Sequence, residues 1–407
     1  MKRLYYGWVI VICSAGLMAF HGLFLYTFGV FFKPLVNEFN WERGILSGAH
    51  STAMLVTGVL SLITGMLCDR LGPRALLTVN GIAAGAALLL MSRVNSLWQV
   101  YLFWGLLMGI ANAAVFIPIT TTVPRWFGKN KGASTGLTLA GIGVGGVMWP
   151  IISQWLISDY GWRQAYVILG ITTIVVVIPL AQFIKSSPQG IDLKRYEERE
   201  ATGNGISPPA GGGLTLKQAV KKGSFWIIAA LLFFEMFYAG TITVHISPHA
   251  LDIGISAVVA AGLLSALSAS QLTGRLLTGF VSDKIGTRLT ATICLFMALL
   301  GLVWLQFARE AWMLYAFVIF FGVWAGGIFP TQIVITAEIF GLKCLGVILA
   351  TLVFFGTIGN AIGPALGGGV FDVTGSYRLA FITIAILCAG AFILSLVLLR
   401  LKEKPTR

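Results

Sequence analysis

A chain of 407 residues that is 57% hydrophobic and only 11% charged has too little polar surface to cover a water-soluble globule, because soluble domains carry about 25% charged residues. The net charge of +13 is spread over short loops between apolar runs, which argues against a domain that binds nucleic acid. The sequence contains no nucleotide-binding loop, no metal-type Cys or His spacing and no nucleophile–base pair. We therefore expect a membrane protein without enzymatic activity, cofactor or bound metal.

Twelve apolar stretches are long enough to span a bilayer, which takes about 20 residues. In chain order they predict an all-α membrane protein with helices at 6–32, 44–68, 74–92, 97–123, 132–157, 164–184, 223–247, 257–281, 289–307, 312–336, 344–370 and 378–400. The first helix follows Met1-Lys2-Arg3 without a small-residue cleavage site, so we expect it to be retained rather than removed as a signal peptide.

One long polar stretch, 185–222, interrupts this pattern with clustered charges, Pro208-Pro209 and three consecutive glycines. Such a composition is typical of a flexible linker. It predicts an N-terminal six-helix bundle at 1–184, a linker at 185–222 and a C-terminal six-helix bundle at 223–407.

The distribution of basic residues predicts the orientation in the membrane. The loops on the side of both termini and the linker hold 21 of the 28 Lys and Arg residues. Because cytoplasmic loops carry the excess of Lys and Arg, we expect a multi-pass protein of the cell inner membrane with both termini cytoplasmic.

The two halves repeat each other at a constant offset. Gly65–Arg74 and Gly279–Arg288 share a pattern of Asp, a basic residue, Gly and Arg, and their aspartates, Asp69 and Asp283, are 214 residues apart. Pro150 and Pro364, inside two of the predicted helices, are separated by the same distance. A shared offset at separate landmarks favours an internal duplication, a known plan of transporters.

These two loops resemble the loop signature of the major facilitator superfamily. The resemblance implies two pseudo-symmetric six-helix bundles around a midplane cavity that opens to either side in alternation. It also implies that the loops form cytoplasmic latches. The latch residues would be Asp69, Arg70 and Arg74 in the first loop and Asp283, Lys284 and Arg288 in the second.

Within that superfamily the chain resembles the monocarboxylate transporters and their bacterial relatives. The resemblance rests on the segment Trp126–Gly141, on Gly7-Trp8 before the first helix, and on one arginine, Arg275, inside the eighth. Where that family often has a lysine in helix one, this chain has Tyr26, and Gln271 replaces an aspartate one turn before the arginine. Both residues are associated with proton coupling in the family, so the identity of the proton carrier stays open.

Charged residues inside membrane helices are costly and face a partner or a cavity. Arginine stays charged and its planar fork suits a carboxylate, so Arg275 is interpreted as a substrate anchor, assisted by Gln271 one turn away. Glu235 is placed at a similar depth and is a candidate proton switch whose protonation would release Arg275. The alternative for both charged residues is a permanent Glu235–Arg275 ion pair.

Further polar residues lie along one face of the predicted seventh helix. Glu235, Tyr238, Ile242, His245, His249 and Asp252 step by three or four residues and form one stripe. Within it, His245 is a candidate substrate ligand, or alternatively a packing histidine. Asp252 is a candidate for proton coupling, or alternatively an ordinary helix-end residue.

Polar residues in other helices are further candidates for hydrogen bonds to a substrate. They are Asn112, Asn360, Tyr26 and His21, for which hydrogen bonding between helices is the alternative. The glycine-rich run 141–146 lies inside a predicted helix and lacks a following Lys-Ser/Thr, so it is interpreted as close helix packing and not as a phosphate loop.

Together these features predict a secondary transporter that moves a small monocarboxylate such as lactate or pyruvate in symport with a proton. One buried cation matches one carboxylate, and the helix at 344–370 contains no Lys or Arg that could bind a second. A dicarboxylate exchanger of the oxalate:formate type is therefore the weaker alternative, and a membrane sensor that does not transport is a remote one. We expect a monomer whose partners are the carboxylate, protons and the lipid bilayer.

Overall fold

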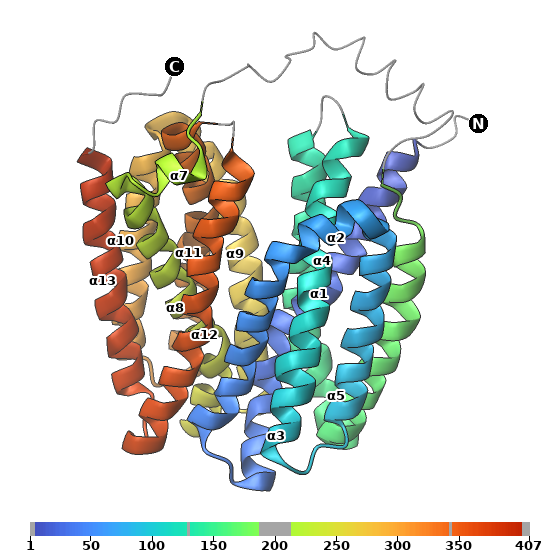
Figure 1. Cartoon of the computed structure of the whole chain (residues 1–407). Coiled ribbons are helices and arrows are strands. Elements are labelled where there is room, and N and C mark those ends of the chain that lie inside the picture. Colours follow the sequence, from blue (N-terminus) through green and yellow to red (C-terminus); the bar gives the residue numbers. More distant parts are fainter. Residues whose placement is uncertain (1–4, 128–130, 187–212, 342–343, 401–407) are drawn as a thin grey trace. The chain divides into compact units, whose positions relative to one another are not determined.

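The computed structural model describes residues 5–127, 131–186, 213–341 and 344–400, and within these ranges the chain is helical apart from short connections (Figure 1). Lipid offers no partner for backbone N–H and C=O groups, so apolar segments satisfy these groups within helices. The N-terminal elements are α1 (Tyr6–Phe39), α2 (Arg43–Met91), α3 (Leu97–Val100), the π-helix η1 (Tyr101–Leu107), α4 (Met108–Thr122), the 3-10 helix η2 (Val123–Trp126) and α5 (Lys131–Gln182). The C-terminal elements are α7 (Leu216–Ala219), α8 (Gly223–Asp252), α9 (Ala257–Ile285), α10 (Thr287–Leu305), α11 (Ala311–Phe340), α12 (Leu345–Thr374) and α13 (Arg378–Arg400).

Eleven of the described segments are long and apolar enough to cross a membrane. The segment Ser134–Gln182 has 49 residues and contains a break at Gly161, where φ is 79°, so it supplies two crossings and brings the total to twelve. The number of spanning helices expected from hydropathy is thereby confirmed. Most of the expected linker, residues 187–212, lies outside the described residues, and α7 lies within its C-terminal part.

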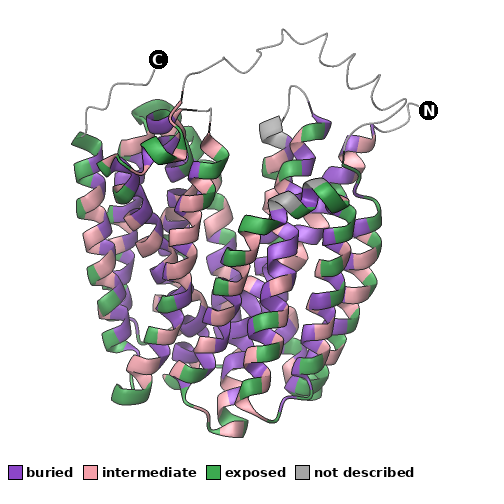
Figure 2. Cartoon of the chain, viewed as in Figure 1, coloured by how far each residue is buried: buried purple, intermediate pink, exposed green. Residues whose placement is uncertain are grey.

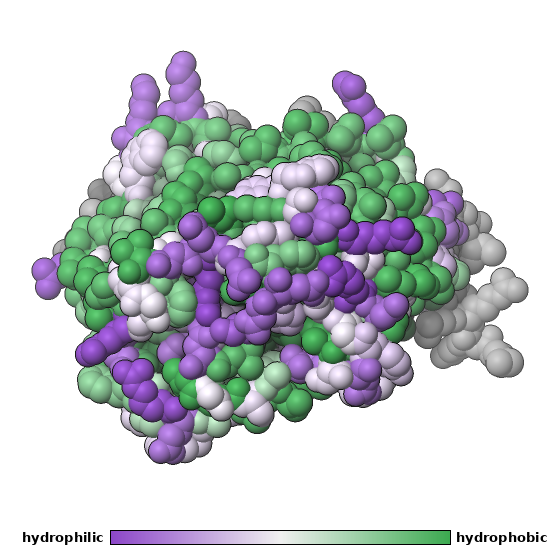
Figure 3. Space-filling model, turned by 90° about the horizontal axis from the view of Figure 1, so that it is seen from below, coloured by the Kyte–Doolittle hydropathy of each residue, from purple (hydrophilic) through white to green (hydrophobic). Residues whose placement is uncertain are grey.

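The side chains on the outward faces of the helices are those of a protein surrounded by lipid. Phe280 is 72% exposed, Ile386 65% and Leu276 64%, and Figure 2 shows exposed residues on the outward faces while buried ones line the packed faces. Viewed from below Figure 1, hydrophilic side chains gather at the helix ends, with hydrophobic ones around them (Figure 3). This is the pattern of a membrane protein, because an apolar surface of this extent would be unstable in water.

Glycine at the repeated loops allows two successive helices to meet at a sharp turn. Gly72 inside α2 has φ 77° and Gly286 between α9 and α10 has φ 88°. A residue with a Cβ rarely adopts this conformation. Gly161 and Gly375 also have positive φ, 79° and 68°, and they too are 214 residues apart in the sequence. The duplication inferred from the loops therefore extends to the backbone turns.

Close backbone contact explains the glycine-rich run in α5. A Cβ at Gly141 would lie 2.1 Å from the carbonyl oxygen of Ala15, and one at Gly145 would lie 2.0 Å from that of Ala19. Any side chain at these positions would push α5 away from α1. The prediction of close helix packing is confirmed.

The helices form two compact units. One consists of Met1–Thr27 and Leu55–Ser207, and the other of Phe28–Met54 and Pro208–Arg407. The end of α1 and the beginning of α2 therefore pack with the C-terminal helices rather than with the rest of their own half. The bundle boundaries expected from the sequence remain a prediction. In the structure, residues 28–54 contact α8 and α12.

Candidate functional site

Arg275 lies on α9, and its side chain is half-buried. Among the described residues it forms no hydrogen bond within the usual distances and no ion pair. Its helix is held tightly against α11 on both sides of it, since a Cβ at Gly326 would lie 2.4 Å from the carbonyl oxygen of Gln271, and one at Gly327 would lie 2.1 Å from Thr278 Cγ2. The backbone that carries Arg275 is therefore held closely against α11.

Glu235 on α8 is buried, with 6% of its surface exposed. Its Oε2 atom has no hydrogen-bond partner among the described residues, while the carboxylate interacts with the backbone of Phe329 in α11 and with the charge of Arg275. The two side chains do not come within the 4.0 Å of an ion pair. The permanent bridge that the sequence left open is therefore not formed in this structure.

Tyr238 on α8 and Gln332 on α11 also have unpaired polar atoms. Neither the Tyr238 hydroxyl nor either amide atom of Gln332 has a hydrogen-bond partner in the described part of the chain. Gln332 is only 2% exposed and was missed by the sequence analysis. A glutamine inside an apolar helix, two residues after Pro330, was the available signal. Buried polar groups are normally paired, so this region is suited to receive water or a ligand.

The other two predicted ligands of the C-terminal helices take different positions. Gln271 lies where the backbones of α9 and α11 are in close contact. Asn360 on α12 faces α8, because a Cβ at Gly240 would lie 2.3 Å from Asn360 Oδ1. That oxygen has no hydrogen-bond partner among the described residues.

In the N-terminal unit, Asn112 on α4 donates a hydrogen bond from Nδ2 to Thr57 Oγ1 at 3.2 Å. Its Oδ1 atom is buried and unpaired within the described structure. Tyr26 is 6% exposed and belongs to the hydrophobic core of the unit. Asn112 therefore keeps a free acceptor, whereas Tyr26 is largely enclosed by apolar neighbours.

Asp252, at the end of α8, has two cationic partners. It forms ion pairs with Lys33 of α1 and Arg43 of α2, and a second contact joins Arg43 Nη2 to Asp252 Oδ1 at 3.0 Å. The Arg43 guanidinium also lies 3.7 Å from the centre of the Phe371 ring. Asp252 therefore ends α8 in contact with two cations, and its part in proton coupling stays a prediction.

His245 is part of the same cluster. Its Nε2 lies 2.8 Å from the carbonyl oxygen of Pro364 and its Nδ1 lies 3.2 Å from the hydroxyl of Tyr377, which accepts a hydrogen bond from Arg43 at 3.0 Å. Burial raises the pKa of Tyr377, so its hydroxyl keeps the proton that it donates to His245. Both ring nitrogens of His245 therefore have protein partners, which favours its interpretation as a packing histidine.

Asp372 completes this group by capping the start of α2. It accepts hydrogen bonds from the backbone N–H groups of Arg43 at 2.8 Å and Gly44 at 2.6 Å, which would otherwise be unpaired at a helix N-terminus. We name Lys33, Arg43, His245, Asp252, Asp372 and Tyr377 the Asp252 cluster. The sequence analysis did not single out Arg43 or Asp372, because both are placed at helix ends, where charge is ordinary.

The repeated loops are only partly described. The side chain of Asp69 lies outside the described residues, whereas Arg70, Arg74, Asp283 and Lys284 are exposed. Arg288 approaches the carbonyl oxygen of Leu398 at 3.5 Å, and Thr287 beside it donates to Glu338 at 2.9 Å. The latch function of these loops stays a prediction.

Twelve membrane-spanning helices with internal duplication, and a half-buried arginine inside one of them, define a multi-pass membrane protein of the transporter class. The sequence profile of the Major Facilitator Superfamily matches residues 14–270 and 240–407. The chain belongs to this superfamily. It is accordingly a transporter and not an enzyme, as expected.

Curated relatives align over nearly the whole chain. Monocarboxylate transporter 13 of Rattus norvegicus is 27% identical over 96% of this chain and 87% of its own length. Monocarboxylate transporter 12 of the same organism is 26% identical over 97% and 85%. The MFS-type transporter YcxA of Bacillus subtilis is 25% identical over 87% and 85%. The chain is thus similar to monocarboxylate transporters, as the sequence motifs indicated.

Solved structures agree on the fold. A bacterial homologue of the human lysosomal transporter Spinster aligns in two inward-facing forms. The occupied form has a TM-score of 0.79 at 16% identity and covers 98% of each chain. The unoccupied form has a TM-score of 0.81 at 17% identity and covers 100% of each chain. At these identities the likeness concerns the fold alone.

Proposed function

We propose that the protein moves a small monocarboxylate, such as lactate or pyruvate, across the cell inner membrane together with a proton. The single observation that supports this most is Arg275, a membrane-embedded cation that binds no protein carboxylate within the described chain. An unpaired charge at this depth is costly unless a ligand or water compensates it. A monocarboxylate supplies one negative charge in a planar geometry that matches guanidinium.

In this proposal the substrate contacts come from Arg275 and Gln271 on α9, Asn360 on α12, and Asn112 and Tyr26 in the N-terminal unit. Glu235 carries the proton. Protonation removes the charge of its buried carboxylate and, with it, the competition for Arg275. Both termini and the linker face the cytoplasm, in line with the bias of Lys and Arg, and the protein works as a monomer by alternating access.

For His245 and Asp252 we propose a structural role in the Asp252 cluster in place of substrate binding and proton coupling. The ring nitrogens of His245 are both engaged, and the carboxylate of Asp252 is shared between two cations. A substrate would have to displace these partners before it could bind.

Uptake of labelled L-lactate into proteoliposomes, with and without an inward proton gradient, tests the proposal. We expect accumulation against the lactate gradient in the native protein and none in Arg275→Ala. Arg309→Ala removes an exposed arginine between α10 and α11 and serves as the matched control, with uptake unchanged. Uptake that only equilibrates and ignores pH would overturn the proton coupling, and no lactate uptake at all would overturn the substrate. Competition by oxalate would then favour the dicarboxylate alternative.

A further inference from the structure

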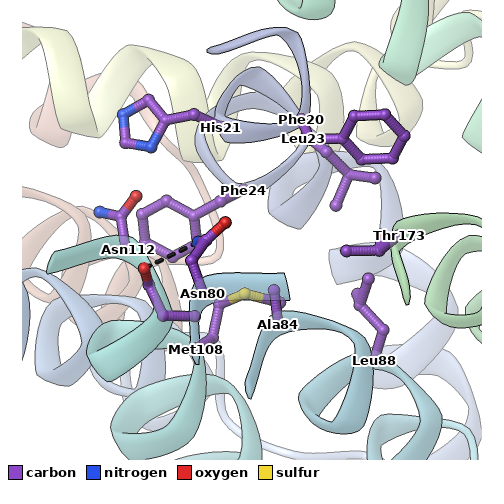
Figure 4. A pocket seen from close by; sticks show the side chains of 11 residues that line it. Phe20, His21, Leu23, Phe24, Asn80, Ala84, Leu88, Met108, Asn112 and Thr173 are labelled. Carbon is purple, nitrogen blue, oxygen red and sulfur yellow. Dashed lines mark hydrogen bonds between the residues drawn. The ribbon is translucent and has the colours of Figure 1, made fainter. Parts of the chain in front are cut away.

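A small internal pocket lies in the N-terminal unit, between α1, α2, α4 and α5 (Figure 4). Apolar side chains, among them Phe24, Leu88 and Met108, form much of its lining. The polar ends of His21, Asn80 and Asn112 lie on one side of the pocket in Figure 4. Every lining residue belongs to the same compact unit, so the pocket is a feature of this unit by itself.

Two polar atoms in the lining have no partner in the described structure. They are His21 Nδ1 and Asn112 Oδ1, both buried from solvent. The two side chains are near enough to interact, yet neither atom forms a hydrogen bond of acceptable geometry. Asn112 itself is 6% exposed, and its orientation is fixed because its amide nitrogen donates to Thr57. A buried acceptor left unpaired in this way indicates a missing donor.

The size of the pocket limits what can bind. The cavity has a volume of about 20 Å³, and one water molecule needs about 10–15 Å³ of such space. A single oxygen atom with its hydrogens therefore fits, whereas a complete carboxylic acid does not.

We propose that this pocket binds one hydroxyl group, which donates a hydrogen bond to Asn112 Oδ1 and forms a second one with His21 Nδ1. Asn112 Oδ1 can only accept, so the bound oxygen must carry a hydrogen. A water molecule satisfies this condition, and so does the alcohol of a 2-hydroxy acid, while a keto or carboxylate oxygen does not. Binding of the substrate alcohol rests on the proposed function, whereas binding of a water molecule does not.

Substitution of His21 by two amides of different length tests the geometry. In His21→Asn the short amide reaches the place of Nδ1, whereas in His21→Gln the longer amide reaches the place of Nε2, and His21→Phe removes all polar atoms. The proposal expects His21→Asn to behave like the native protein and the other two variants to lose the bound hydroxyl. The measurements are the Tm of the purified protein and the KM values for L-lactate and for propionate, which lacks the hydroxyl.

If water is the ligand, His21→Gln and His21→Phe lower Tm while the ratio of the two KM values stays at the native value. If the substrate hydroxyl is the ligand, the KM for lactate rises about 2- to 10-fold in these variants, as for one lost hydrogen bond, and the KM for propionate does not change. Equal behaviour of His21→Asn and His21→Gln in both measurements would overturn the proposal. Lower Tm values in His21→Gln and His21→Phe but not in His21→Asn, in a protein that takes up no lactate, would leave the site intact and overturn only the proposed function.

Discussion

Two charged regions of the same compact unit are built in opposite ways. In the Asp252 cluster each carboxylate oxygen and each nitrogen of His245 has a protein partner. On α8, α9 and α11, in contrast, the described structure shows no ion pair for Arg275, and one carboxylate oxygen of Glu235 and both amide atoms of Gln332 lack a hydrogen-bond partner. The paired cluster joins neighbouring helices, whereas in our proposal the groups around Arg275 and Glu235 contact the substrate and the proton.

The largest effect on stability is expected at Arg43. Its removal in Arg43→Ala leaves Asp252 with Lys33 alone and breaks the contact with Tyr377. Because the Asp252 side chain is 18% exposed, the expected loss is about 1–3 kcal/mol, below the cost of breaking a fully buried pair. Thermal unfolding of the purified protein should show a clear fall in Tm. The double variant Arg43→Ala/Asp252→Ala should recover part of it, since the carboxylate is removed with its guanidinium partner and the remaining charge, Lys33, is 23% exposed to solvent. A native Tm in Arg43→Ala would show that the cluster does not stabilise the fold.

Arg275→Ala is expected to show the reverse behaviour, with lost transport and a nearly native Tm, because the substitution breaks no ion pair within 4.0 Å among the described residues and removes only the longer-range attraction to Glu235. Truncating one partner of a buried charge pair with a ligand costs about 2–5 kcal/mol, which corresponds to a loss of at least about 30-fold in lactate uptake. Arg275→Lys keeps the charge without the planar fork and should retain partial uptake. A variant that transports normally would remove Arg275 from the proposed site.

Glu235→Gln tests whether Glu235 carries the proton in the proposed binding region. The amide keeps the size of the side chain but cannot carry a proton, so we expect lactate exchange to continue while proton-driven accumulation disappears. For one proton per lactate, a gradient of one pH unit accounts for about tenfold accumulation in the native protein. Counterflow and gradient-driven uptake, measured side by side, separate the two activities. Full accumulation in the variant would assign the proton to another residue.

The smallest effect is expected for Gln332→Leu. Removing a buried polar group that has no partner should not destabilise the protein and can raise its stability by about 1 kcal/mol. The matched control is Gln154→Leu, because Gln154 is also buried but donates a hydrogen bond to Ser158, and it should lose stability. Equal losses of Tm in the two variants would mean that Gln332 has a structural partner after all.

The fold was largely accessible from the sequence. The apolar lengths gave the number of crossings, and the glycines of the repeated loops, Gly72 and Gly286, indicated turns that the structure shows with positive φ. Helix ends were less accurate: α2 runs from Arg43 to Met91 with the turn inside it, because a turn of one residue interrupts the hydrogen-bonded pattern only briefly. The packing of 28–54 with the C-terminal helices carries no local signal in the sequence.

The sequence by itself determined the membrane character, the duplication and the identity of the charged residues, because these depend on composition, segment length and local backbone preference. Only the tertiary structure decided which of those charges are paired. Asp252 and Glu235 belong to one predicted polar stripe on the same helix, yet one meets Arg43, 209 positions away in the chain, and the other has an unpaired oxygen. The physical reason is that a partner on another helix depends on helix rotation and packing, which hydrophobic pattern alone does not determine.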